Sequence, residues 1–436
     1  MSTHETLRTS SSPLGAILRV TSGNFLEMYD FMVFGYYSTW IAKTYFPNRS
    51  EFAALMLSLA TFGAGFLMRP LGAVVLGSYA DRHGRRAGLL LTLLLMAAGT
   101  LSIACTPGYA TIGLAAPLIV LLGRLLQGLS AGAELGSVSV YLSEIAPPHR
   151  KGLYVSWQSA SQQLAVIAAA VLGLVLAEKL SPAAMEAWGW RVPLWLGCAL
   201  IPFLFWIRSS LEETAPFLAR KKRTSTPEIF RSLRLNWRIV VIGAMLTAFT
   251  TTAFYMITAY TPTYGISTLH LERRSALLVT LCVGLTNFIL LPVMGSLSDR
   301  IGRRPLLLLC TLLAILTGYP ALSWLTAAPS FHRLLLVELW LAVLYASYNG
   351  AMVVYLTEVM PADVRSTAFS LAYSLATAVF GGYTPAICTY LIHVSNNKAV
   401  PGAWLATAAA LALLATVLKG KSQEEHGQTI SSLGGR

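Results

Sequence analysis

Ionisable side chains lie deep inside stretches that are otherwise apolar. Among them are Glu27, Asp30, Arg69, Arg124 and Glu134. A charge inside hydrocarbon costs several kcal/mol, so side chains of this kind in a membrane segment usually mark a functional site. A carboxylate opposite a guanidinium can act as a proton switch. The pair keeps the carboxylate ionised until an anion occupies the guanidinium, and the freed carboxylate can then take up a proton. These residue types therefore predict coupled binding of a proton and an anion.

The carboxylates are candidate proton sites. Glu27 and Asp30 are three residues apart and share one face of a helix. Asp30 is the first choice because it lies near the middle of its apolar segment, and Glu27 is the second. Glu134 lies ten residues from Arg124. It either faces a cavity as a relay or lies in a helix interface, where it must be protonated.

Arg69 lies eight residues from the inner end of its apolar segment, too deep for its head to reach the lipid headgroups easily. Two roles remain open for it. It could bind a carboxylate of the substrate, or it could pair with Glu27 and stabilise the fold.

The elements that position these residues are membrane helices. Hydrophobic residues make up 55% of the chain and charged residues only 12%, which excludes a soluble domain of this length. Crossing a bilayer takes about 20 apolar residues. Such segments are predicted at 17–45, 53–77, 87–107, 114–142, 154–178, 192–209, 238–262, 275–297, 305–326, 333–359, 366–393 and 402–419. The predicted fold is an all-α membrane protein of twelve transmembrane helices in two pseudo-symmetric six-helix bundles.

A ten-residue motif occurs twice. Gly-Ser-Tyr-Ala-Asp-Arg-His-Gly-Arg-Arg at 77–86 returns as Gly-Ser-Leu-Ser-Asp-Arg-Ile-Gly-Arg-Arg at 295–304, half a chain later. A second repeat, Tyr-Leu-Ser/Thr-Glu, begins at Tyr141 and at Tyr355. A membrane chain built from two like halves is typical of a transporter. Alignment of the repeats places Glu338 opposite Arg124. Glu338 is either a second coupling site or, as we expect, a solvated residue at the outer rim.

Each half supplies charges for a gating latch. The acid–base pair of the motif and a glutamate at a helix end would form a network that locks one conformation and dissolves in another. The latch residues are Asp81, Arg85, Glu144, Asp299, Arg303 and Glu358. The alternative is that they only cap helix ends and set the topology.

The chain divides into an N-terminal bundle (1–209), a basic cytoplasmic linker (210–236), a C-terminal bundle (237–419) and a disordered cytoplasmic tail (420–436). With both termini in the cytoplasm, Lys and Arg concentrate on the cytoplasmic side, as the positive-inside rule requires. The net charge of +13 is thereby explained by lipid headgroups, without nucleic acid. The five cysteines fit no disulfide or metal motif, and no metal, cofactor or catalytic residue set is expected.

The repeated motif resembles the loop motif of the major facilitator superfamily, and Arg124-Leu-Leu-Gln127-Gly128 resembles its Arg-x-x-Gln-Gly element. Ser-Gly-Asn-Phe-Leu-Glu-Met-Tyr-Asp-Phe at 22–31 and Phe-Leu-Met-Arg-Pro-Leu-Gly at 66–72 resemble the metabolite–proton symporters. The strings at 15–24, 156–163, 260–265 and 348–352 are similar to those of the citrate and tricarballylate porters. The fifth helix lacks the Gly-Pro of drug exporters, which argues for symport.

The resemblance implies that the first and fourth helices line a common cavity, where Asp30 and Arg124 could meet. A tricarboxylate needs several donors, at least one of them cationic. The N-terminal half offers Asn24, Arg69, Arg124, Gln127, Gln158 and Gln162. The C-terminal half offers neutral groups: Thr251, Tyr255, Asn287, Tyr348, Asn349, Tyr373 and Ser374.

The function expected from this resemblance is proton-coupled import of citrate or tricarballylate across the inner (plasma) membrane. The protein would be a monomer that works by alternating access, with the tricarboxylate anion, protons and membrane lipid as its only partners. One alternative is symport of another metabolite, such as a dicarboxylate, 2-oxoglutarate, shikimate or a zwitterionic osmolyte. A membrane sensor or receptor that has lost transport is the alternative from another class.

Overall fold

The computed structural model describes the backbone of residues 13–47, 50–83, 85–132, 134–209, 231, 234–360 and 365–433. These residues form helices and the short turns that join them. The linker predicted at 210–236 lies almost entirely outside the described residues. So do the first twelve residues.

The first half of the chain consists of helices and short helical turns. They are α1 (Pro13–Tyr36), α2 (Ser38–Tyr45), α3 (Glu51–Leu67), α4 (Arg69–His83), α5 (Arg85–Cys105), α6 (Tyr109–Ile112), α7 (Ala115–Ala131), α8 (Glu134–Ile145), η1 (Pro148–Arg150), α9 (Lys151–Lys179), α10 (Pro182–Ala187), η2 (Gly189–Arg191) and α11 (Val192–Ser209).

The second half contains longer helices and three π-helical segments. The α-helices are α14 (Trp237–Tyr255), α15 (Thr261–Thr263), α16 (Arg273–Ile301), α17 (Arg303–Ala327), α18 (Phe331–Val359), α19 (Arg365–Ala376), α20 (Thr384–Ser395) and α21 (Val400–Leu433). The π-helical segments are η3 (Met256–Tyr260), η4 (Tyr264–Thr268) and η5 (Thr377–Gly382).

Where the structure describes them, the apolar segments predicted from the sequence are helical apart from single turn residues. Within the described residues, nine helices are long and apolar enough to cross a membrane. The other three predicted segments correspond to α1 with α2, α5 and α11. One difference lies at the C-terminus: α21 continues to Leu433, over residues where the sequence predicts a disordered tail. Lys, Gln and Glu in this stretch favour a helix.

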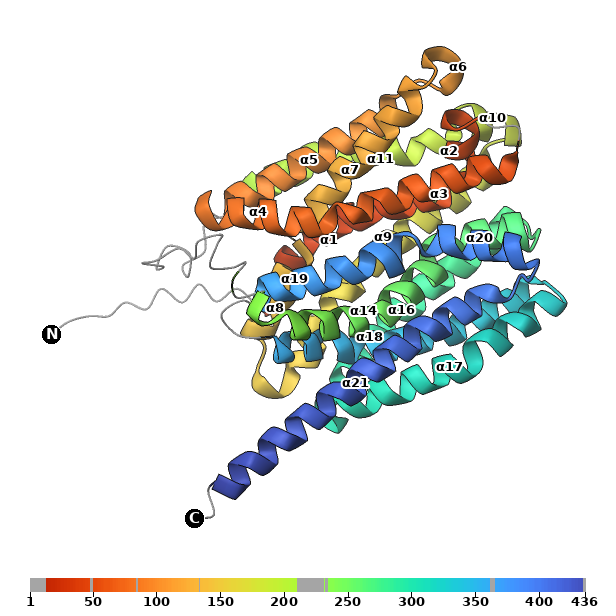
Figure 1. Cartoon of the computed structure of the whole chain (residues 1–436). Helices are drawn as coiled ribbons and strands as arrows, with labels where there is room; N and C mark the ends of the chain where they lie inside the picture. The colour runs from red at the N-terminus through yellow and green to blue at the C-terminus, as the bar shows by residue number, and fades with distance from the viewer. Residues whose placement is uncertain are drawn as a thin grey trace.

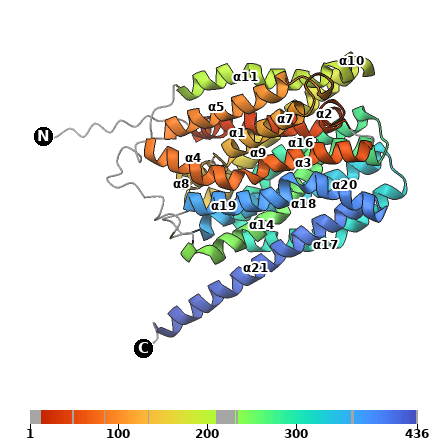
Figure 2. The same cartoon turned by 45° about the horizontal axis from the view of Figure 1, so that its top comes forward.

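The two halves form separate bundles that pack side by side (Figure 1). Their most extensive contact runs between α9 and α16. A Cβ on Gly152 would come within 2.3 Å of the Gly295 carbonyl oxygen, so only glycine allows these two backbones to touch. In both views, α4, α8 and α19 begin or end at the same side of the molecule as the end of α21 (Figure 2). We call this the motif side and the opposite one the far side.

The halves are in contact on both sides of the bundle. On the motif side, the Thr357 hydroxyl lies 3.3 Å from the Ser143 hydroxyl of the other half. On the far side, the Ser38 and Thr263 hydroxyls are 3.0 Å apart. The His393 ring stacks on Phe52 with 3.8 Å between ring centroids. The two halves therefore touch on both sides of the molecule.

Candidate substrate and proton site

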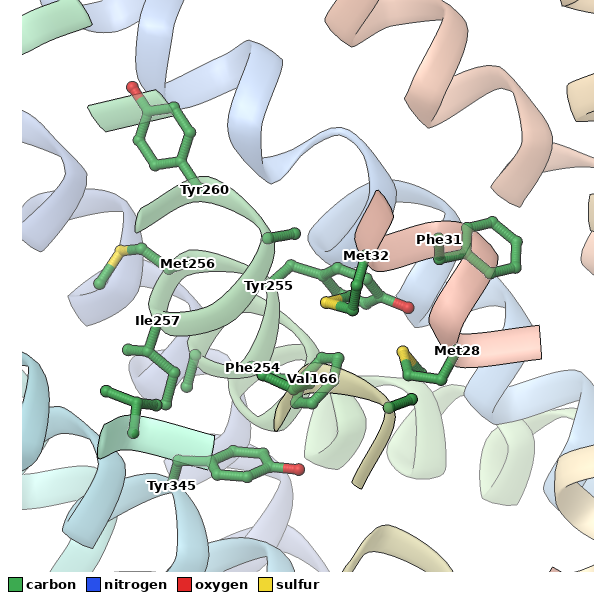
Figure 3. Packing of buried hydrophobic residues seen from close by; sticks show 14 of the residues in the cluster. Met28, Phe31, Met32, Val166, Phe254, Tyr255, Met256, Ile257, Tyr260 and Tyr345 are labelled. Carbon is green, nitrogen blue, oxygen red and sulfur yellow. The ribbon is translucent and has the colours of Figure 1, made fainter. Parts of the chain in front are cut away.

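A small cavity lies between these two sets of contacts, and residues of both halves line it. Its volume is about 10 Å³, room for about one water molecule and far below the roughly 300–1,000 Å³ of typical small-ligand sites. The lining residues are Met28, Arg69, Leu135, Gln162, Thr251, Phe254, Tyr255 and Tyr373. Figure 3 shows Met28 of α1 close to Tyr255 and Phe254 of α14. Five of the predicted substrate residues line this cavity: Arg69, Gln162, Thr251, Tyr255 and Tyr373.

Arg69 both lines the cavity and pairs with Glu27. It is the first residue of α4, after the turn at Met68. Its Nη2 lies 3.0 Å from Glu27 Oε1, and both side chains are buried. The guanidinium also lies over the faces of Phe31 and Phe66, at 4.8 and 4.5 Å from the ring centroids. Nε has no hydrogen-bond partner in the described part of the chain. The two roles left open for Arg69 are thus compatible.

Asp30 is buried in a polar contact with the third predicted helix. Thr100 of α5 donates a short hydrogen bond to Asp30 Oδ2, and Gln127 Nε2 donates to the same oxygen at 3.4 Å. Oδ1 accepts no hydrogen bond from the described residues. A carboxyl with one oxygen unsatisfied and only 1% exposure is poorly stabilised as an anion. Nothing in the sequence distinguishes Thr100 from the many other threonines in apolar segments.

Arg124 is enclosed by aromatic rings. It is 0% exposed, and its guanidinium carbon lies 4.4 Å from the Phe31 centroid, 4.6 Å from Phe34 and 5.1 Å from Phe62. Nη1 donates to Gln127 Oε1 at 2.7 Å. Within the described residues, Arg124 and Asp30 make no direct ion pair. Gln127 lies between them and contacts both.

Five buried amides have an NH₂ group without an acceptor among the described residues: Asn24, Gln158, Gln163, Asn287 and Asn349. Ser159 donates to Gln158 Oε1 at 2.9 Å, and Thr250 donates to Asn349 Oδ1 at 2.7 Å. Each hydroxyl occupies the amide oxygen, so the NH₂ group is left as a donor. Gln158 Nε2, Asn349 Nδ2 and Asn24 Nδ2 have no acceptor among the described residues. Asn24 lies four residues before the lining residue Met28, and Gln158 lies four before Gln162. Asn349 is bonded to Thr250, the neighbour of the lining residue Thr251.

The other predicted residues lie apart from this set. The Tyr348 hydroxyl donates to the Leu246 carbonyl at 2.8 Å, so it is occupied within its own half. Asn287 is fully buried, with both amide atoms unpaired in the described structure. Ser374 and Glu134 are buried as well. The expectation that Glu338 is a solvated rim residue is wrong, because it is only 4% exposed. The π-helical end of the seventh span packs over it, which helical spacing does not reveal.

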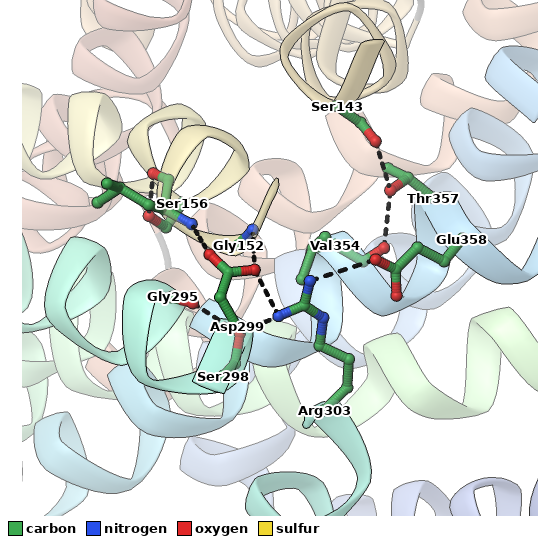
Figure 4. Close-up of polar contacts among 11 residues, drawn as sticks. Ser143, Gly152, Ser156, Gly295, Ser298, Asp299, Arg303, Val354, Thr357 and Glu358 are labelled. Atoms are coloured by element: carbon green, nitrogen blue, oxygen red, sulfur yellow. Dashed lines mark hydrogen bonds and ion pairs between the residues drawn. The ribbon is translucent and has the colours of Figure 1, made fainter. Parts of the chain in front are cut away.

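The second copy of the repeated motif forms a charge network (Figure 4). Asp299 accepts hydrogen bonds from the backbone of Gly152 at 2.8 Å and of Leu153 at 3.0 Å, at the start of α9 in the other half. Arg303 lies 2.7 Å from Asp299 and 3.2 Å from Glu358. Anions are stabilised at helix N-termini, so this network ties the halves together. The side chains of Asp81 and Arg85 lie outside the described ones, and Glu144 is exposed.

Comparisons with known proteins agree with this architecture. The family model described as Major Facilitator Superfamily matches residues 20–385 and 274–432. The chain is 58% identical to a protein of Salmonella typhi named citrate-proton symporter, over 96% of each chain. It is 58% identical to one of the same name from Klebsiella pneumoniae, over 92% of this chain and 91% of that one. The Alpha-ketoglutarate permease of Escherichia coli K12 is 36% identical over 84% of each chain.

Solved structures show the same fold. A partially occluded inward-open structure of the xylose transporter XylE from E. coli superposes with a TM-score of 0.75 at 21% identity, covering 94% of this chain and 98% of that one. The predicted fold is confirmed, and the molecule is a multi-pass membrane protein. With the family model matching most of the chain, this protein belongs to the Major Facilitator Superfamily.

Proposed function

We propose that this protein is a citrate–proton symporter of the inner (plasma) membrane. The observation that carries the proposal is Arg69 Nε, a buried donor without an acceptor on a residue that lines the central cavity. The unpaired amides of Asn24 and Gln158 lie one helical turn from lining residues, and that of Asn349 is bonded to Thr250, next to a lining residue. Buried donors cost free energy when they stay unpaired. Carboxylate oxygens would satisfy them. The relatives named citrate-proton symporters, identical at 58% of positions, support citrate as the anion.

Both halves would share the recognition of the anion. Arg69 supplies a cation. It lines the cavity together with Tyr255 and Tyr373, and its charge acts on both phenol groups. Arg69 is favoured over Arg124 for this contact because it lines the cavity, whereas three phenyl rings enclose Arg124. Gln158 and Asn349 donate from opposite halves. An anion that bridges the halves in this way would favour their closure around it.

Asp30 is the proton site in this proposal, with Glu27 and Glu134 as the other candidates. Gln127 accepts a hydrogen bond from Arg124 and donates one to Asp30. A proton on Asp30 would therefore weaken the bond that Gln127 donates and would affect its contact with Arg124. Protonation removes a buried charge that is poorly satisfied, so the free-energy cost of the state closed around the substrate falls. Proton and anion would thus favour each other's binding, which is the requirement for symport.

The motif side would face the cytoplasm, as the distribution of Lys and Arg supports. Both termini would then be cytoplasmic. Asp299, Arg303 and Glu358 would act as a latch that holds this side closed while the far side opens. The protein would act as a monomer, because its own two halves supply the whole cavity.

Uptake of labelled citrate into proteoliposomes tests the proposed function. An inward proton gradient should drive accumulation, and tricarballylate should compete for uptake. Excess 2-oxoglutarate, shikimate and proline should not. Accumulation of one of these compounds without any citrate uptake would refute citrate as the substrate. The assignment of the fold would be unaffected.

Asn349→Asp should lower the apparent affinity for citrate by about tenfold or more, because like charges brought together in a buried site repel by several kcal/mol. Thr250 can still donate to the new carboxylate, so local packing is preserved. Citrate binding measured by calorimetry in detergent checks this. Asn396→Asp, on an exposed far-side turn, is the matched control and should leave affinity unchanged. Equal affinities of the two variants would remove Asn349 from the site.

A further inference from the structure

Glu338 of α18 is a buried acid that the proposed transport cycle does not use. It lies seven residues from the far-side start of its helix and is only 4% exposed. Thr261 Oγ1 lies 3.1 Å from Oε1, and Oε2 has no hydrogen-bond partner in the described chain. No Lys, Arg or His of the described residues lies within ion-pair distance of it. An ionised carboxylate in this position would be largely uncompensated.

The surrounding groups offer no alternative counter-charge. Tyr264 and, beyond it, Cys388 of α20 and Tyr260 are the titratable neighbours on the packed elements. Two cations at the far-side starts of α16 and α18 have other partners: Arg273 lies over Trp40, and Arg333 donates to the Trp324 carbonyl. His332 and Lys398 are exposed.

The hydrogen bonds of Thr261 favour a protonated Glu338. The Thr261 hydroxyl also lies 3.1 Å from the Met256 carbonyl, but it has a single hydrogen to donate. If Glu338 is ionised, Thr261 must donate to it and the Met256 carbonyl loses this hydroxyl donor. If Glu338 is protonated, it can donate to Thr261, which donates onward to Met256. Only the protonated carboxyl therefore allows both contacts of the Thr261 hydroxyl to be hydrogen bonds.

This chain of hydrogen bonds belongs to the far-side closure. Thr261 starts α15, the short segment between the π-helical segments η3 and η4. Two residues on, Thr263 is in hydrogen-bond contact with Ser38 of the other half. A Cβ on Gly35 of α1 would lie 3.2 Å from Ala259 of η3. π-Helical turns inside transmembrane helices often occur at functional sites. Glu338 thus supports the wall that closes against α1 and α2.

We propose that Glu338 is a second proton-binding site, and that its proton stabilises the state in which the far side is closed. Opening of the far side would hydrate the carboxyl and release the proton, so closure and protonation are linked. The site goes beyond the proposed symport of citrate, since it requires alternating access but no particular substrate.

Hydrogen–deuterium exchange of the full-length protein without substrate tests this. The measured quantity is exchange in 33–45 and 256–268, divided by the intrinsic rate at each pH. In an Asp30→Asn background, which removes the first proton site, this ratio should rise with pH by up to about tenfold per unit. Adding Glu338→Gln, a permanently neutral side chain, should make it independent of pH. Glu272→Gln, an exposed far-side acid, is the matched control and should keep the rise.

A second variant tests the hydrogen-bond chain and covers a failure of Glu338→Gln to fold. Thr261→Val removes a hydrogen bond that is worth more to a charged acceptor than to a neutral acid. The pH midpoint of the exchange ratio should therefore move upward, and Thr261→Ser should restore it. An unchanged pH response in the Glu338→Gln protein would overturn the proposal, as would an unmoved midpoint in Thr261→Val. Citrate uptake is measured separately, so a wrong substrate leaves this test intact.

Discussion

Asp30→Asn should abolish accumulation of citrate against a gradient while leaving exchange of internal for external citrate. The amide cannot carry a proton, so the accumulation ratio under an inward proton gradient should fall to about one. Thr100 and Gln127 can still contact the amide, and the buried site loses no volume. Exchange survives because a permanently neutral side chain resembles the protonated, substrate-loaded state.

The measurement uses proteoliposomes, with labelled citrate outside and either buffer or unlabelled citrate inside. Glu51→Gln, an exposed acid at the start of α3, serves as the control and should accumulate citrate as the parent protein does. Concentrative uptake by the Asp30→Asn protein would exclude Asp30 and transfer the role to Glu27 or Glu134.

Removal of the Arg69 charge should weaken citrate binding by about 10- to 100-fold, since a hydrogen bond to a charged group is worth about 1.5–3 kcal/mol. Arg69→Gln alone would leave Glu27 buried without its ion-pair partner. The informative variant is therefore Arg69→Gln with Glu27→Gln, compared with Glu27→Gln alone. Arg69→Lys should also lower the affinity for citrate. The planar guanidinium can donate to Glu27 and into the cavity at the same time, and a single ammonium group cannot reproduce that geometry.

Calorimetry in detergent gives the affinity, and thermal melting shows whether each variant is folded. Arg333→Gln, on the far side of α18 and bonded to the Trp324 carbonyl, is a matched control and should bind citrate normally. If the double variant binds citrate as tightly as Glu27→Gln does, the anion is held elsewhere. A loss of binding in Arg124→Gln would then place the charge at Arg124, the other cation that the sequence offers.

Alternating access requires that the contacts between the two halves can form and break on each side of the molecule. The motif-side closure depends on charge-assisted bonds from Asp299 to the start of α9. The far-side closure depends on hydroxyl and ring contacts, such as Ser38 with Thr263. Different chemistry at the two ends allows protonation and substrate binding to act on them separately.

The sequence by itself determined the helices, the two-fold repeat and the short set of functional candidates. Hydrocarbon leaves no other spanning structure for a single apolar segment, so length and hydropathy suffice to place each helix. Charges are expensive there, and Glu27, Asp30, Arg69 and Arg124 therefore stood out. The motif at 295–304 also placed Asp299 and Arg303 four residues apart as latch partners, and they meet although Gly302 separates α16 from α17.

Only the tertiary structure decided which charges meet and which face the cavity. Spacing along one helix does not give its rotation against another, so the sequence could not show that Arg69 contacts Glu27 while Phe31, Phe34 and Phe62 enclose Arg124. Thr100 acquires its role only from its position opposite Asp30. Glu338 is buried because the π-helical end of another span covers it. The hydrogen bonds of Glu27, Asp30 and Glu338 join residues that are 42, 70 and 77 positions apart. At such separations the packing of helices, rather than helical periodicity, decides which side chains are neighbours.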